Sequence, residues 1–182
     1  MNAPMLNRRE TFLGGVAAIW AVPVVTSAQA AQAVLTWNPR ALSLEEARTL
    51  AAASERIIPA TSTPGAIGVG VPQFIDRALA DWCEADDVQR LKLGLRDLGA
   101  GFAALPAAEQ DVRLRQAEAE ARTLATQRPP KPHWFLTLRE LTTVGYFTSQ
   151  TGATKVLRYD PVPGEYRGCV PVKEIGVAWA TS

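Results

Sequence analysis

The chain has 182 residues, of which 47% are hydrophobic and 20% charged, a composition typical of a globular protein and not of a disordered one. Its length fits one domain with a sizeable core. Outside Arg8, Arg9 and Glu10, which lie in the leader described next, 17 basic and 17 acidic side chains remain, so the balance excludes an electrostatic footprint for nucleic acid or an anionic membrane and favours a protein partner.

Residues 1–30 have the pattern of an export signal. The segment NRRETFLGG at residues 7–15 resembles a twin-arginine signal, with Arg8 and Arg9 ahead of an apolar run and one extra residue before Phe12. The apolar run at 12–25 has 14 residues, fewer than the roughly 20 that span a bilayer. Small residues at 28–30 are typical of a cleavage site. We expect periplasmic export by the twin-arginine route, with residues 31–182 as one domain. The alternative is an uncleaved anchor or a soluble N-terminal helix.

Five stretches with helical spacing of apolar residues follow in the chain. The first covers 44–58 and starts at a capping box of Ser43 and Glu46. The second covers 72–82, starts at Pro72 and presents an apolar face that includes Phe74 and Trp82. The others are expected at about 85–98, 106–125 and 133–151. These stretches predict an all-α bundle of four to five helices.

The segment 152–182 is rich in Gly and Pro and should form an extended, irregular C-terminal tail, apart from a short turn or strand at 155–159. Its residue types are those enriched at interface centres. The alternative is that some aromatic side chains complete the chain's own core, Tyr146 first among them because of its helical spacing. The predicted partner interface consists of Tyr146, Phe147, Arg158, Tyr159, Tyr166, Arg167 and Cys169.

Catalytic and metal-binding patterns are missing from the sequence. It contains one His and two Cys, with no spacing typical of a metal site. His133 is expected to be a capping or surface residue, and Glu84, Asp86 and Asp87 are expected where a helix dipole favours acidic side chains. The glycine-rich segment 65–70 lacks the final glycine of a dinucleotide-binding loop. We therefore expect no catalytic residue, cofactor or metal in this chain.

The two cysteines, Cys83 and Cys169, lie far apart in the sequence. In an oxidising compartment they can pair with each other, or Cys169 can bond to a partner chain while Cys83 stays buried, or both can remain free thiols. The sequence leaves these alternatives open.

Several short motifs, in this order, are similar to one family. They are RIIPATSTPGA at 56–66, VPQFID at 71–76, GYFTSQTGA at 145–153, LRYDPVPG at 157–164 and CVP at 169–171. With the leader, they resemble the gluconate 2-dehydrogenase subunit 3 family, the small subunits of membrane-bound, flavin-dependent gluconate and sugar dehydrogenases.

The resemblance implies a non-catalytic subunit that helps a large partner to mature and to be exported. The partner would be a flavoprotein of the glucose–methanol–choline type that carries FAD, and a cytochrome c subunit with haem c would pass electrons to the membrane. Membrane association would come through these partners, and the substrate would depend on the large subunit. The alternatives are an independent small periplasmic enzyme and a free-standing binding or scaffold module.

Overall fold

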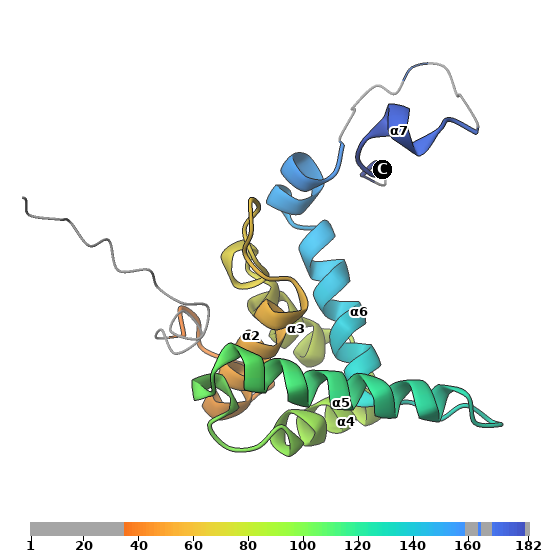
Figure 1. Ribbon diagram of the computed structural model, residues 1–182. Helices are drawn as coiled ribbons and strands as arrows, with labels where there is room; N and C mark the ends of the chain where they lie inside the picture. Colours follow the sequence, from red (N-terminus) through yellow and green to blue (C-terminus); the bar gives the residue numbers. More distant parts are fainter. Residues whose placement is uncertain (1–34, 159–163, 165–168, 181–182) are drawn as a thin grey trace, which may run out of the picture.

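Five long helices form the body of the molecule in the computed structural model, which describes residues 35–158, 164 and 169–180 (Figure 1). These helices are α2 (Leu44–Ile57), α3 (Val71–Asp81), α4 (Ala85–Asp97), α5 (Ala107–Ala125) and α6 (Trp134–Phe147). Shorter elements are the 3-10 turns η1 (Ile67–Val69) and η2 (Phe102–Ala104), the π-helix η3 (Gly152–Val156) and the helix α7 (Val172–Ile175). The prediction of an all-α bundle is confirmed.

Local side-chain bonds fix where the helices begin. At α2, the Ser43 hydroxyl accepts from the Glu46 amide at 3.3 Å, and the Glu46 carboxylate accepts from the Ser43 amide at 2.8 Å, so the predicted capping box is present. At α6, His133 is the N-cap, and its Nδ1 accepts from the amide of Phe135 at 3.2 Å. The sequence-based expectation that His133 caps a helix is confirmed.

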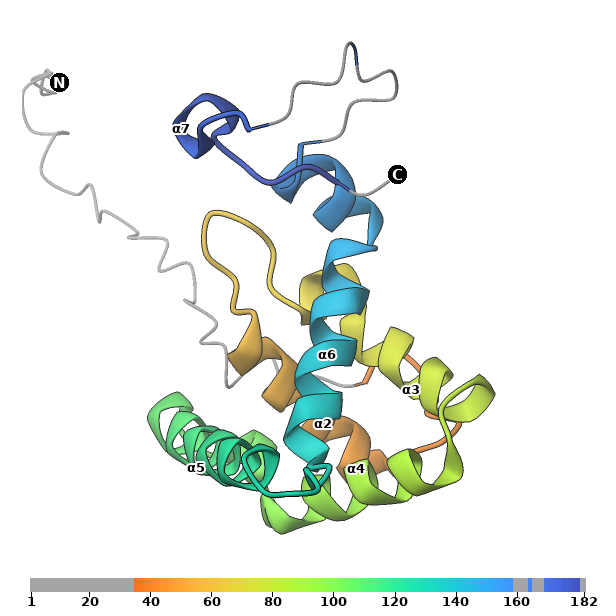
Figure 2. The same ribbon diagram turned by 90° about the vertical axis from the view of Figure 1, so that its right-hand side faces the viewer.

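The core is centred on α6, which packs against each of the other four long helices (Figure 2). Large side chains with less than 2% exposure fill the space between them. They include Leu50 of α2, Ile75 of α3, Leu91 and Leu95 of α4, and Leu138 of α6. Because α6 crosses the centre, its C-terminal end carries the chain out of the bundle and sets where the tail begins.

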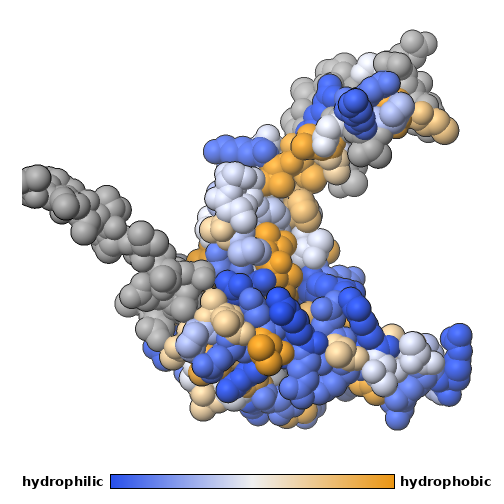
Figure 3. All heavy atoms as spheres, viewed as in Figure 1, coloured by the Kyte–Doolittle hydropathy of each residue, from blue (hydrophilic) through white to orange (hydrophobic). Residues whose placement is uncertain are grey.

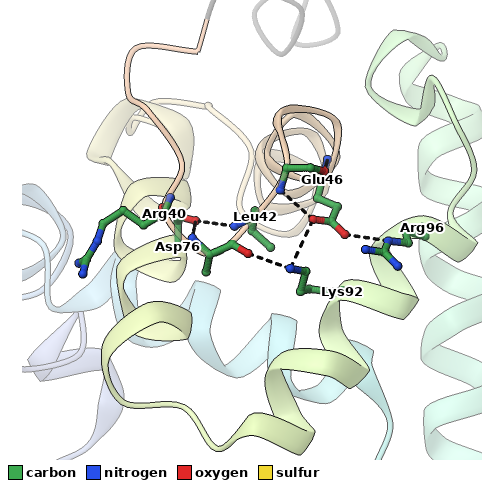
Figure 4. Close-up of polar contacts among 8 residues, drawn as sticks. Arg40, Leu42, Glu46, Asp76, Lys92 and Arg96 are labelled. Atoms are coloured by element: carbon green, nitrogen blue, oxygen red, sulfur yellow. Dashed lines mark hydrogen bonds and ion pairs between the residues drawn. The ribbon is translucent and has the colours of Figure 1, made fainter.

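Asp76 of α3 holds the segment that precedes α2, in what we call the N-terminal latch. Its side chain is 1% exposed, and its carboxylate accepts three backbone hydrogen bonds, from the amides of Arg40 (2.8 Å), Ala41 (3.1 Å) and Leu42 (3.2 Å). Lys92 of α4 donates to the carbonyl of Ala41 at 2.9 Å (Figure 4). Residues 40–42 are therefore tied to two helices and belong to the folded unit.

The end of α6 differs from the sequence-based expectation. The helix stops at Phe147, not at residue 151, and the π-helix η3 follows. Ser149 explains the break, because its hydroxyl donates to the carbonyl of Tyr146 at 2.6 Å and accepts from the amide of Gly152 at 3.0 Å. A serine side chain that bonds nearby backbone groups competes with the helical ladder.

Candidate partner-binding surface

A group of apolar side chains lies where α3 and α6 meet, and we call it the α3–α6 patch. It combines the half-buried Phe74 and Leu141 with the exposed Trp82 and Val144. The Phe74 and Trp82 rings meet edge to face with centroids 5.7 Å apart. A Cβ at Gly145 would lie 2.5 Å from the Phe74 ring, so this glycine lets the two helices approach closely. Trp82 is 64% exposed and Val144 43% exposed, which leaves much of the patch open to solvent.

The position of Trp82 corrects the expectation that it belongs to the buried face of its helix. The helix α3 ends at Asp81, and Trp82 is the C-cap, with φ −145° and ψ −10°. Because its backbone is no longer helical, its side chain does not continue the row of buried residues formed by Ile75 and Leu79. The indole instead lies back over Phe74 at the surface.

The described tail pairs with itself. The Arg158 amide donates to the carbonyl of Ala178, and the Ala180 amide donates to the carbonyl of Arg158, both at 2.8 Å. The Arg158 guanidinium carbon lies 4.3 Å from the ring centroid of Trp179, a cation–π contact. The short turn or strand expected at 155–159 agrees with η3 and with the bridge at Arg158. The loop expected beyond it differs in two respects, because this pairing joins distant residues and α7 adds a short helix.

Beyond η3, whose Val156 packs against the core, the described tail stands apart from the bundle. In Figures 1 and 2, α7 lies beyond the C-terminal end of α6 and away from helices α2 to α5. Figure 3 shows hydrophobic residues along α6 and again at the start of the tail. Trp179 is 42% exposed and Val177 53% exposed. The α3–α6 patch and the tail thus form the main candidate surface for a partner.

The residues predicted for the interface have different positions. Tyr146 is 2% exposed, and its hydroxyl donates to the carbonyl of Pro64 at 2.8 Å. It therefore belongs to this chain's own core and is not available to a partner. Phe147 is half-buried with its ring edge-on to Tyr146, while Arg158 is exposed. The remaining predictions, Tyr159, Tyr166 and Arg167, and the signal residues Arg8 and Arg9, fall outside the described residues.

Cys83 and Cys169 are both free thiols in the structure. Cys83 is half-buried beside α4, and burial, with a smaller effect of Asp87, raises the pKa of its thiol. Cys169 is exposed. The structure does not pair them, and both the intramolecular bridge and a bond from Cys169 to a partner stay predictions.

The polar residues considered for catalysis have structural roles at helix ends. Glu84 is the N-cap of α4, and Asp86 and Asp87 lie in its first turn, where the helix dipole favours them. Burial lowers the pKa of His133, and the Glu120 carboxylate, 3.9 Å from its Nε2, offsets this only in part. In the part of the chain that the structure describes, no group of three or more His, Cys, Asp or Glu side chains is placed to hold a metal ion.

Within the ranges that the structure describes, no helix combines the length and the apolar character needed to cross a bilayer.

Comparison with known proteins places this fold in a family. A family model described as gluconate 2-dehydrogenase subunit 3 matches residues 44–164, from the first residue of α2 through α6 and into the tail. No curated protein and no solved structure matched the chain. A third subunit implies partner subunits in a dehydrogenase complex. The chain belongs to the gluconate 2-dehydrogenase subunit 3 family.

Proposed function

We propose that this chain is a non-catalytic accessory subunit that binds a large FAD-dependent dehydrogenase of the glucose–methanol–choline type. Two observations carry the proposal: the open α3–α6 patch, and a tail that pairs with itself away from the bundle. Trp82, Val144 and Trp179 are exposed there, and aromatic residues of this kind dominate the energy of protein interfaces. Membership in a family of dehydrogenase subunits supplies the class of partner.

In this proposal FAD belongs to the large subunit, and haem c belongs to a cytochrome subunit that links the complex to the membrane. The twin-arginine-like leader with Arg8 and Arg9 would carry the folded complex to the periplasm. The chain would thereby help the catalytic subunit to mature and to be exported. The substrate would be a sugar or sugar acid selected by the large subunit.

Co-purification tests the binding role. A tagged chain, produced together with the other subunits, should retain a much larger flavoprotein with flavin absorbance and dye-linked sugar oxidation. The same chain produced alone should show neither property. Replacing Trp82 and Val144 with serine should reduce the recovered flavoprotein, whereas Val112→Ser should not, because Val112 is 63% exposed on α5, outside both candidate surfaces.

Two outcomes would contradict the proposal. One is flavin binding or sugar oxidation by the isolated chain, which would favour an independent enzyme. The other is unchanged recovery of the flavoprotein with the patch variants. Export is tested separately: deletion of residues 1–30 should leave the flavoprotein in the cytoplasm, and its normal appearance in the periplasm would refute the carrier role.

A further inference from the structure

A second surface lies on the other side of α3. A groove of about 540 Å³ opens between the C-terminal end of α3 and the outer side of α4. We call it the α3–α4 groove. Its apolar lining and its charged rim are formed by Leu79, Cys83, Val88, Leu93, Lys92 and Arg96. On α4 these residues follow one strip at helical spacing, so the groove runs along the helix axis.

Leu93 is the residue of this groove that the fold does not need. Its neighbours in sequence, Leu91 and Leu95, are 0% and 1% exposed and fill the core. Leu93 is 50% exposed and points away from them. Large apolar side chains on single surface positions are common, but this one lines a concave site beside the buried Leu79 and the half-buried Cys83 and Val88. It therefore offers contact area to a partner at no cost to the core.

The rim of the groove carries more positive than negative charge. Lys92 and Arg96 lie one turn apart and both reach towards Glu46 (Figure 4), with Arg96 Nε 2.8 Å and Lys92 Nζ 4.0 Å from its carboxylate. Burial alone raises the pKa of Glu46, but hydrogen bonds from Ser43 and Arg96 and the nearby Lys92 outweigh it and hold the pKa below its usual value. Two cations therefore share one carboxylate that stays ionised.

Arg96 has donors left over. Only its Nε bonds to Glu46, and its two terminal amino groups have no hydrogen-bond partner among the described residues. Its side chain is 62% exposed. A guanidinium presents its donors in a planar fork that matches a carboxylate. The rim is thus complementary to an acidic side chain beside the apolar floor.

We propose that the α3–α4 groove binds an amphipathic helix of a partner subunit, with an apolar side chain on Leu93 and an Asp or Glu on Arg96. This inference rests on the proposed function, because it needs a complex. A groove bounded by two helices suits a third helix that inserts residues one turn apart. The surplus positive charge selects an acidic helix over a basic one.

Charge substitutions at Leu93 test this inference in the assembled complex. Leu93→Glu should weaken association of the chain with the partner subunits by at least about tenfold, the effect of losing one central apolar contact. Leu93→Lys removes the same contact but should weaken the association less than Leu93→Glu does, because the incoming helix is acidic. Val112→Glu is the matched control and should stay within about twofold of wild type. Equal losses for the glutamate and lysine variants would overturn the proposed acidic partner.

A photo-crosslinker placed at position 93 identifies the occupant. The expected product joins this chain to a partner subunit at a peptide with an acidic residue within about one helical turn of the crosslink. A product between two copies of this chain, or no product above that of position 112 in an assembled complex, would refute the inference. If the wild-type chain forms no complex, the proposed function fails instead, so the two failures are distinguishable.

Discussion

The N-terminal latch gives the most direct test of the physical reasoning. Asp76→Asn keeps the shape of the side chain but replaces one carboxylate oxygen with an amino group. In the native latch one oxygen accepts from the Arg40 amide, and the other accepts from the amides of Ala41 and Leu42. Asparagine can keep the bonds from Ala41 and Leu42 through its remaining oxygen, but its amino group then faces the Arg40 N–H. The Arg40 N–H loses its acceptor, and the new amino group finds none there.

The size of the effect follows from these bonds. A buried donor without a partner costs about 1–3 kcal/mol, and each remaining bond loses about 1 kcal/mol when its acceptor becomes neutral. The lower cost of burying an amide than a carboxylate offsets part of this sum. We therefore expect Asp76→Asn to lower the free energy of unfolding by about 2–3 kcal/mol, a large share of a typical domain's stability.

Urea unfolding of the full chain measures this loss, and Asp81→Asn is the control. Asp81 pairs with the Arg40 side chain at 2.8 Å but is 45% exposed, so its loss should cost below about 1 kcal/mol. Hydrogen exchange adds a local readout, because the amides of residues 40–42 should exchange faster only in Asp76→Asn. The reasoning is refuted if the two variants are equally stable or if those amides exchange at the wild-type rate.

Two further predictions concern α4 and α6. Gly94→Ala should destabilise the chain by about 2–3 kcal/mol in urea unfolding, because the added Cβ would lie 2.1 Å from the Trp134 ring; Gly68→Ala, whose nearest atom is at 3.3 Å, should change little. The depressed pKa of His133 means that the unfolded chain binds more protons below about pH 6.5. The free energy of unfolding should therefore decrease as the pH is lowered through that window. His133→Asn, which retains a cap, should flatten this pH profile.

The sequence predicted the helices well because their signals are local. Ser43 with Glu46, Pro72 and the prolines around residue 130 mark helix boundaries that depend on neighbouring residues. The same reasoning failed for Trp82, whose spacing matched a buried face although the helix had already ended. It also missed Ser149, since a serine near a helix end stops the helix only when its hydroxyl takes over the backbone bonds.

The candidate surfaces depended on contacts between distant residues and were harder to predict. The pairing of Arg158 with Trp179 and the three bonds to Asp76 join segments 21 and 34–36 positions apart, and no local pattern specifies them. Tyr146 shows the opposite case, because helical spacing had pointed to the core as its alternative place. The surplus charge at Arg96 could be seen only once Glu46, Lys92 and Arg96 were brought together by the packing of α2 on α4.

The latch also determines where this protein can be shortened. Judged by its helices alone, the domain would begin at Ser43, and a truncation there would look harmless. Such a cut would remove all three donors of Asp76 and the acceptor of Lys92 on Ala41. It would also strip Leu42, which is 7% exposed, from the core. Fusions and shortened forms should therefore keep at least residues 40–42 ahead of α2.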